Sequence, residues 1–266
     1  MTNLKNAVIK SVHFVGIGGI GISALAQWYL SEGYEVSGTD IIKSDITEML
    51  KGGGVKIFNF QFSISKFQKQ KEAIKKYIKN ASAIIYSSAV PQNDFQIEYA
   101  EKIGKKILSY PEALGELTKK YKTICVSGTH GKSTTTAMLA LIMIKAGIDP
   151  TVILGTKMRE LVAAPAVSRI RRCRILATAG AARGNNNFRK GKSEWLLIEA
   201  DEYKAAFLNY SPQMIVLTNI DKDHMDYYKD MSHILDVYSE YIKNLPRDGA
   251  LIFNGDDENI RKIFAK

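Results

Sequence analysis

The sequence is poor in cysteine and has no long apolar run. It holds two cysteines in 266 residues, Cys125 and Cys173, which form neither a disulfide framework nor a metal-binding pattern. No stretch approaches the ~20 apolar residues that a membrane-spanning helix needs. The first ten residues also lack the apolar core of a signal peptide. These absences argue against a disulfide-stabilised secreted protein and against membrane insertion, and we expect a cytoplasmic protein.

Acidic residues are also scarce, 27 against 37 basic ones, so the net charge is +10. Such a charge raises the question of nucleic acid binding, but the excess is local. Eight basic residues and no acidic one lie between Leu161 and Lys192, which leaves a charge of only +2 for the rest. No pattern of interleaved aromatic residues and no nucleic-acid-binding motif accompanies them. We therefore expect no nucleic acid partner.

The remaining composition is that of a globular protein, with 45% hydrophobic and 24% charged residues, and the length allows two domains. Apolar segments of strand length alternate along the chain with segments of helical period. The alternation predicts an α/β fold with a first, Rossmann-like domain over residues 1–108 and a second domain over residues 109–266.

The first domain begins with a dinucleotide-type glycine motif. A predicted strand at residues 11–15 leads into Gly-Ile-Gly-Gly-Ile-Gly at residues 16–21, and a helical pattern follows. The next predicted strand ends at Asp40, the acidic position that the fingerprint expects. The motif predicts a Rossmann-like half that binds a diphosphate ligand, and a tight turn without a ligand remains the alternative.

A second loop of the first domain joins this candidate site. The predicted strand at residues 83–86 ends in Ser87, Ser88 and Ala89 ahead of Pro91. Because ligands of parallel sheets lie beyond the carboxyl ends of the strands, this loop is a candidate together with the glycine motif. A simple turn before the proline is the alternative. The candidates of the first domain are Gly18, Gly19, Ile20, Gly21, Asp40, Ser87, Ser88 and Ala89.

The second domain opens with a phosphate-binding loop. A predicted strand at residues 123–126 precedes the loop, and a helix over residues 135–145 follows it. In such a loop Lys132 can reach the β- and γ-phosphates, and the Ser133 hydroxyl can bind Mg²⁺. Its first glycine stands four residues before the lysine, where the usual pattern has six, so this is a shortened variant; an exposed lysine on a glycine-rich turn is the alternative. The candidates for ATP binding here are Gly128, Thr129, His130, Gly131, Lys132, Ser133 and Thr134.

Two further apolar strands of the second domain end in polar residues. The segment at residues 195–198 leads into Glu199, and the segment at residues 214–220 leads into a stretch that contains His224. A single carboxylate at a strand end is usually structural. Three strands that deliver polar groups at their carboxyl ends predict a common site, in which a carboxylate supplies a second Mg²⁺ ligand.

The segment at residues 161–184 differs from the rest of the chain. It contains five of the nine arginines and seven alanines but none of the 28 lysines. We interpret it as an insertion, or as the product of a reading-frame or assembly error, that is not part of the fold. A flexible basic loop over the nucleotide site is the alternative.

Taken together, these motifs resemble those of the Mur ligases. The resemblance rests on residues 16–21, 87–90 and 128–136, and on the segments at 199–202 and 218–228. It implies a UDP-sugar-binding domain followed by a P-loop central domain, and it implies that the third domain of the family and the end of the central domain are absent. The chain is thus expected to be a fragment with little or no turnover.

The resemblance also implies a reaction and its residues. In this family ATP phosphorylates the lactyl carboxylate of UDP-N-acetylmuramic acid, and the amine of L-alanine attacks the acyl phosphate. Lys132, Glu199 and His224 would be catalytic, and Mg²⁺ would be bound by Glu199, His224 and Ser133, which replaces the more usual threonine. His130 and Asn219 would complete the ATP site. The UDP end would be held by Gly18, Gly19, Ile20, Gly21, Ser87, Ser88 and Ala89.

Three other functions remain open at this point. One is the related ligase that attaches a recycled tripeptide to the same sugar nucleotide, because residues 199–203 resemble that enzyme as well. Another is a non-catalytic module that binds a UDP-sugar or a nucleotide. The last is a nicotinamide-dependent dehydrogenase built on the first domain.

Overall fold

The computed structural model describes residues 10–60, 64–158 and 186–264. The segment at residues 161–184 lies outside the described residues, so its interpretation as an insertion stays a prediction. The chain divides into two compact units, the first ending at Tyr110 and the second beginning at Pro111. The boundary predicted from the sequence lies two residues earlier.

The first unit is built on a parallel sheet with the strand order β3-β2-β1-β4-β5. Its strands are β1 (Ser11–Val15), β2 (Glu35–Asp40), β3 (Lys56–Asn59), β4 (Ala83–Tyr86) and β5 (Lys106–Ser109). Its helices are α1 (Ile20–Ser31), α2 (Asp45–Gly52), α3 (Ile64–Asn80) and α4 (Phe95–Lys102). From β1 the chain proceeds to β2 on one side, and β4 lies on the other side. The turn after β1 therefore lies at the switch point where parallel sheets bind ligands.

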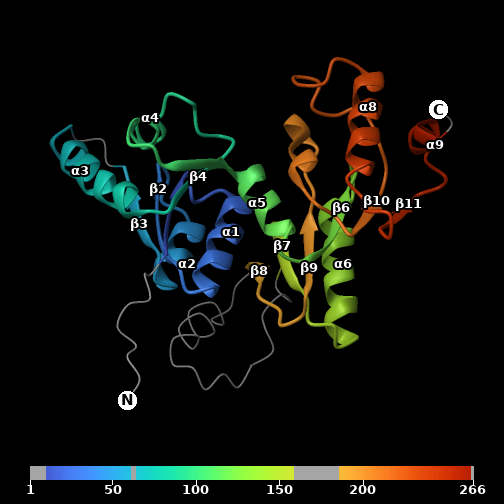
Figure 1. Ribbon diagram of the computed structural model, residues 1–266, viewed down its shortest axis with the longest axis horizontal. Coiled ribbons are helices and arrows are strands. Elements are labelled where there is room, and N and C mark those ends of the chain that lie inside the picture. Colours follow the sequence, from blue (N-terminus) through green and yellow to red (C-terminus); the bar gives the residue numbers. More distant parts are fainter. Residues whose placement is uncertain (1–9, 61–63, 159–185, 265–266) are drawn as a thin grey trace. The chain divides into compact units, whose positions relative to one another are not determined.

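The elements of the first unit follow from local sequence signals. The apolar residues Phe14, Ile84 and Ile85 are fully buried in the central strands. Ser44 and Thr47 form a reciprocal capping box at the start of α2, and Asp94 caps α4 by accepting a hydrogen bond from the backbone of Gln96. Figure 1 shows α1 and α2 on one side of this sheet and α3 and α4 on the other.

The second unit contains a six-stranded sheet with the order β11-β10-β6-β9-β7-β8. Its strands are β6 (Lys122–Ser127), β7 (Thr151–Met158), β8 (Asn186–Arg189), β9 (Trp195–Glu199), β10 (Met214–Leu217) and β11 (Ala250–Phe253). Its helices are α5 (Tyr110–Thr118), which starts at the unit boundary, α6 (Lys132–Lys145), the 3₁₀ helix η2 (Tyr203–Asn209), α8 (Met231–Ile242) and α9 (Glu258–Phe264). Only β7 and β8 pair antiparallel.

The predicted α/β fold, with a Rossmann-like unit ahead of a unit that carries the phosphate loop, is confirmed. Several element boundaries differ from the sequence prediction, and α6 begins at Lys132 instead of residue 135. The strand expected over residues 214–220 ends at Leu217, because Thr218 and Asn219 turn to bond with the phosphate loop. The strand β8 was not predicted, since four residues rich in asparagine carry little strand signal. Of the helices in the described ranges, none is long and apolar enough to span a membrane.

Candidate active site

The phosphate loop connects β6 to α6 and depends on two glycines. Gly128 has φ +126°, and a Cβ atom there would clash with Oγ1 of Thr218. Gly131 has φ +81° and is the N-cap of α6, so the first backbone N–H groups of the helix lie beside the loop. Lys132, Ser133 and Thr134 form the first turn of this helix. The loop therefore presents backbone donors, an ammonium group and hydroxyls at a helix N-terminus, which is a geometry suited to phosphate.

The end of β10 clamps the loop from one side. The side-chain amide of Asn219 accepts a hydrogen bond from the backbone N–H of His130 at 2.8 Å and donates to its carbonyl oxygen at 2.9 Å. Thr218 Oγ1 donates to the same carbonyl oxygen at 2.7 Å. The backbone N–H of Thr129 donates to Asn219 O at 3.1 Å. The two predicted residues His130 and Asn219 thus lie together, because the Asn219 side chain bonds to the backbone of His130 in the phosphate loop.

Lys132 is engaged with the protein through three groups. Its Nζ donates to Gly128 O at 2.7 Å, to Thr129 O at 3.3 Å and to both carboxylate oxygens of Glu202 at 2.8 and 3.0 Å. The side chain of Glu202 is only 4% exposed. Burial raises the pKa of Glu202 above its ordinary value, although the Lys132 ammonium acts in the opposite direction.

Glu202 was not among the residues predicted for the site. Its position shortly after the predicted strand at residues 195–198 pointed to the site. However, three acidic residues, Glu199, Asp201 and Glu202, follow that strand closely. The sequence could not indicate which of them turns inward to a lysine 70 positions away.

The predicted metal ligands Ser133 and Glu199 lie together on the other side of the loop. Ser133 Oγ donates to Glu199 Oε1 at 2.6 Å, and Glu199 Oε2 accepts a hydrogen bond from the backbone N–H of Gly155 at 2.9 Å. A Cβ atom at Gly155 would lie 2.9 Å from Glu199 Oε2, so a side chain there would displace the carboxylate from its present position. A hydroxyl and a carboxylate in contact are oxygen donors of the kind that Mg²⁺ prefers.

His224 lies beside Glu202, a carboxylate that was not among the predicted metal ligands. Its Nε2 lies 3.8 Å from Glu202 Oε1. Together with Asp201 these residues offer three ligand atoms within 4.8 Å of one another, the one such His–carboxylate group in the described part of the chain. Glu199 does not belong to this group. A shared metal bound by Ser133, Glu199 and His224 therefore stays a prediction.

Tyrosines hold the segment around His224. The backbone of His224 has φ +53°, and its ring lies 4.7 Å from the ring of Tyr203 at a tilt of 40°. Tyr203 donates a hydrogen bond to Asp226 at 2.8 Å, which raises the pKa of the tyrosine. The hydroxyl of Tyr228 donates to the backbone oxygen of Glu202. These contacts fix His224 and Glu202 relative to each other.

In the first unit the glycine turn is closed by Asp40. One carboxylate oxygen of Asp40 accepts a hydrogen bond from Gly18 N at 2.7 Å, and the other accepts one from Ile42 N at 2.9 Å. Both oxygens are therefore occupied by the backbone of the unit itself. A role of Asp40 in binding UDP-sugar stays a prediction.

The serine loop of the first unit lies beside the glycine turn. Ser87 N donates to Val15 O at 2.9 Å, and a Cβ atom added to Gly19 would lie 3.7 Å from Ser87 Oγ. Ser87 Oγ also accepts a hydrogen bond from Ala89 N at 3.4 Å, so Ser87, Ser88 and Ala89 form a turn. Ile20 and Gly21 follow in the first turn of α1. The predicted candidates of the first unit thus lie at one edge of its sheet.

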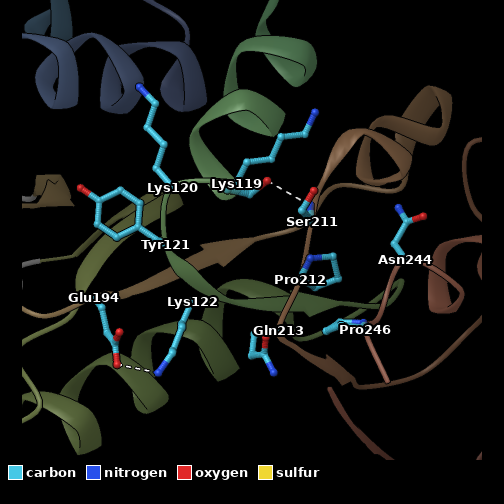
Figure 2. A pocket seen from close by; sticks show the side chains of 11 residues that line it. Lys119, Lys120, Tyr121, Lys122, Glu194, Ser211, Pro212, Gln213, Asn244 and Pro246 are labelled. Carbon is cyan, nitrogen blue, oxygen red and sulfur yellow. Dashed lines mark hydrogen bonds and ion pairs between the residues drawn. The ribbon is translucent and has the colours of Figure 1, made fainter. Parts of the chain in front are cut away.

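The second unit also has a hollow at the end of its strands that lies opposite the phosphate loop. It has a volume of about 430 Å³ and lies at the amino-terminal ends of β6 and β10, whereas the loop follows their carboxyl ends. Figure 2 shows Lys119, Lys120 and Lys122 around it, with Lys122 directed at Glu194. Lys119 and Lys120 directly follow the carboxyl end of α5, where cations balance the partial negative charge of the helix. The lysines therefore have a structural explanation.

Comparison with known proteins gives a consistent result over nearly the whole chain. Residues 11–122 match the pattern of the Mur ligase family, catalytic domain, and residues 126–266 match that of the Mur ligase middle domain. A UDP-N-acetylmuramate–L-alanine ligase of Clostridium botulinum (strain Okra / Type B1) is 38% identical over 255 residues, which are 96% of this chain and 48% of the relative. The corresponding ligase of Clostridium perfringens is 33% identical over 98% of this chain and 50% of its own. The chain thus spans about half the length of these curated relatives.

Solved structures show the same fold. A UDP-N-acetylmuramate–alanine ligase of Thermotoga maritima matches with a TM-score of 0.73 and 26% identity over 95% of this chain and 51% of its own. A UDP-N-acetylmuramate:L-alanyl-γ-D-glutamyl-meso-diaminopimelate ligase of Neisseria meningitides matches with a TM-score of 0.74 at 23% identity, over 97% of this chain and 75% of its own.

Proposed function

Because the chain belongs to the Mur ligase family, we propose that it is the substrate- and ATP-binding part of a ligase that joins L-alanine to UDP-N-acetylmuramic acid. The proposal combines the names of the relatives with the geometry of the phosphate loop. The observation that carries it is the arrangement of Lys132 and of the Ser133–Glu199 pair at the N-terminus of one helix. A module that only bound nucleotide would need the backbone donors of the loop but not this pair of a hydroxyl and a carboxylate.

The proposed reaction activates a carboxylate, which is otherwise a poor electrophile. An oxygen of the lactyl carboxylate attacks the γ-phosphorus of ATP, the bond to the β-phosphate oxygen breaks, and ADP leaves. The amine of L-alanine then attacks the acyl carbon, phosphate leaves with the bonding electrons, and the nitrogen loses a proton. Neutralising the charge between anionic oxygens is the main catalytic requirement of the first step.

The residues of the second unit fit that requirement. Lys132 would neutralise the β- and γ-phosphates, helped by the N–H groups at the start of α6. Ser133 and Glu199 would hold Mg²⁺, which would add positive charge at the phosphoryl oxygens, and the hydrogen bond between them keeps two oxygen donors side by side. His224 would supply a metal ligand, and it lies in the group that it forms with Asp201 and Glu202. Asn219 would keep His130 and the loop in the shape that phosphate needs.

The first unit would hold the UDP-sugar. Its glycine turn offers backbone N–H groups at the start of α1, and the serine loop adds hydroxyls at the same edge. The turn contains no lysine or arginine, so a diphosphate would be bound by backbone donors and the helix N-terminus. L-Alanine is the proposed amine substrate because both curated relatives carry that name. The tripeptide ligase is less favoured, since its likeness at 23% identity concerns the fold alone.

Titration calorimetry of the chain with UDP-N-acetylmuramic acid and, separately, with NAD tests this proposal. We expect binding of the UDP-sugar and no binding of NAD. Because turnover by this chain is expected to be low, a long parallel incubation with ATP, Mg²⁺ and the UDP-sugar compares L-alanine with the tripeptide, and mass spectrometry detects trace amounts of ligated product. Binding of NAD without binding of the UDP-sugar would overturn the proposal in favour of a dehydrogenase, and product from the tripeptide alone would reassign the amine substrate.

A further inference from the structure

The ammonium of Lys132 has no hydrogen-bond donor left over. A lysine has three N–H donors, and those of Lys132 face the carbonyl oxygens of Gly128 and Thr129 and the carboxylate of Glu202. A phosphate oxygen that binds Lys132 has to replace one of these acceptors. The carboxylate is the strongest competitor, because its bond to the ammonium is charge-assisted and buried.

Glu202 is held in place through its backbone. Its carbonyl oxygen accepts hydrogen bonds from Ala205 N at 2.9 Å and from the hydroxyl of Tyr228. The next turn contains Lys204 and Ala205 at φ +51° and +55°, a conformation that costs an L-residue about 1–2 kcal/mol. Of the four non-glycine residues with positive φ in the described ranges, these two and His224 surround Glu202. Strain of this kind persists where the surrounding contacts determine the backbone, and it clusters at functional sites.

We propose that Glu202 competes with nucleotide phosphate for the ammonium of Lys132 and thereby sets the affinity of the loop for ATP. The inference rests on the proposed function, in which this loop binds ATP. Two effects of the carboxylate oppose phosphate. It occupies the donors of Lys132, and its negative charge repels an anion at the same place. Glu202 is in this sense a regulator of the site, and Lys132 changes partner when phosphate arrives.

The substitution Glu202→Gln tests the competition. Glutamine keeps the shape and one acceptor but lacks the charge, so Lys132 becomes available to phosphate. We expect the affinity for ATP, measured by calorimetry in the presence of EDTA, to rise by about tenfold, an estimate from one like charge removed at contact distance. Inorganic tripolyphosphate should show the same gain, because the effect concerns phosphate and not the nucleoside.

Controls separate the competition from a general change in charge. Glu194→Gln also removes one negative charge from the second unit, but it does so at the amino-terminal ends of the strands, where Glu194 pairs with Lys122. This variant should leave both affinities within about twofold of the wild type.

In a Lys132→Ala background, Glu202→Gln should raise the affinity for ATP clearly less, because the two residues act through one contact. Glu202→Asp, which keeps the charge but shortens the side chain, provides a second variant if Glu202→Gln is poorly folded by thermal unfolding, and its gain should be smaller than tenfold.

The outcomes distinguish this inference from the proposed function. If the wild type binds neither ATP nor tripolyphosphate and no Glu202 variant does, the assignment of the loop to ATP fails. If the wild type binds ATP through Lys132 but Glu202→Gln binds it equally or more weakly, the competition is refuted while the ATP site stands. A loss of affinity in that variant would mean that Glu202 positions Lys132 for phosphate.

Discussion

The two glycine turns of the molecule have the same backbone plan and use carboxylates differently. Each connects a central strand with parallel neighbours to the N-terminus of a helix, α1 in the first unit and α6 in the second. In the first unit the carboxylate of Asp40 bonds to backbone N–H groups. In the second unit the carboxylates of Glu202 and Glu199 bond to the side chains of Lys132 and Ser133.

This difference distinguishes a turn suited to ligand binding from a turn suited to catalysis. A turn whose carboxylate closes its own backbone offers shape and N–H donors, which suffices to bind a diphosphate. A turn whose carboxylates face a lysine and a hydroxyl holds opposite charges that a substrate or a cation can take over. The second turn therefore has the charged groups that the proposed phosphoryl transfer requires, while the first has the backbone donors that the proposed UDP-sugar site requires.

The largest effect should come from removing the charge that only the second turn has. Lys132→Ala should lower ligation in the complete enzyme by about 10³-fold, the upper range for a single group that stabilises transition-state charge. UDP-sugar affinity should stay unchanged, because we propose that this ligand binds to the first unit. Steady-state kinetics and calorimetry measure the two effects, and an equal loss in both would show that the turns do not divide the work as described.

The phosphate loop should also be the less tolerant of added bulk. Gly128→Ala places a methyl group against Thr218 at φ +126°, and strain and overpacking together should cost about 3–4 kcal/mol of unfolding free energy. Gly131→Ala is the matched control, because φ is +81° there but no atom lies within 4 Å of the added Cβ. It should cost about 1 kcal/mol. Urea unfolding checks the pair, and equal costs would contradict the assigned clash.

Acid should destabilise the first unit through a buried histidine in its central strand, β1. His13 bonds to Ser37 and Gln96, and burial lowers its pKa from 6.5 to about 4. Between pH 6.5 and 4 the unfolded chain binds a proton that the folded unit does not, so stability falls as the pH falls through this window. The loss should reach about 3 kcal/mol at pH 4. Urea unfolding at several pH values measures it, and His13→Asn should flatten the curve over this range.

A smaller effect is expected for the carboxylate of the first turn. Asp40→Asn keeps one acceptor for the backbone and should cost about 2 kcal/mol of unfolding free energy, because one charge-assisted hydrogen bond is lost. UDP-sugar affinity should change less than threefold. A loss of tenfold or more without destabilisation would instead assign Asp40 to ligand binding, and the contrast between the turns would weaken.

The smallest effect should follow deletion of residues 161–184. Met158 pairs with Asn186 across β7 and β8, so the ends of the connection are already neighbours. The deletion would leave residues 159, 160 and 185 as a three-residue connection, a common hairpin length. Stability should change by less than about 1–2 kcal/mol and should rise if anything, since a shorter loop costs less entropy to close. A loss of several kcal/mol would contradict the interpretation as an insertion.

Much of the fold and part of the site could be predicted from local sequence. The strands at residues 11–15 and 83–86 have the predicted ends, and the two glycine motifs lie where strand and helix signals placed them. The pairing of β7 with β8 could not be predicted, because neither periodicity nor turn residues connect segments with a long stretch between them. The carboxylate partner of Lys132 was missed for a similar reason, since residue type does not indicate which of several neighbouring carboxylates is buried.

The sequence by itself determined the phosphate loop, since its glycines, its lysine and the start of α6 are neighbours along the chain and act through local backbone geometry. Only the tertiary structure decided which polar and charged side chains surround that loop. The strand order β10-β6-β9 brings Asn219 to one side of the loop and Glu199 to the other, and the turn after β9 buries Glu202 against Lys132. These contacts join residues 66 to 89 positions apart, and packing of the sheet, not local propensity, selects among the acidic residues that could have made them.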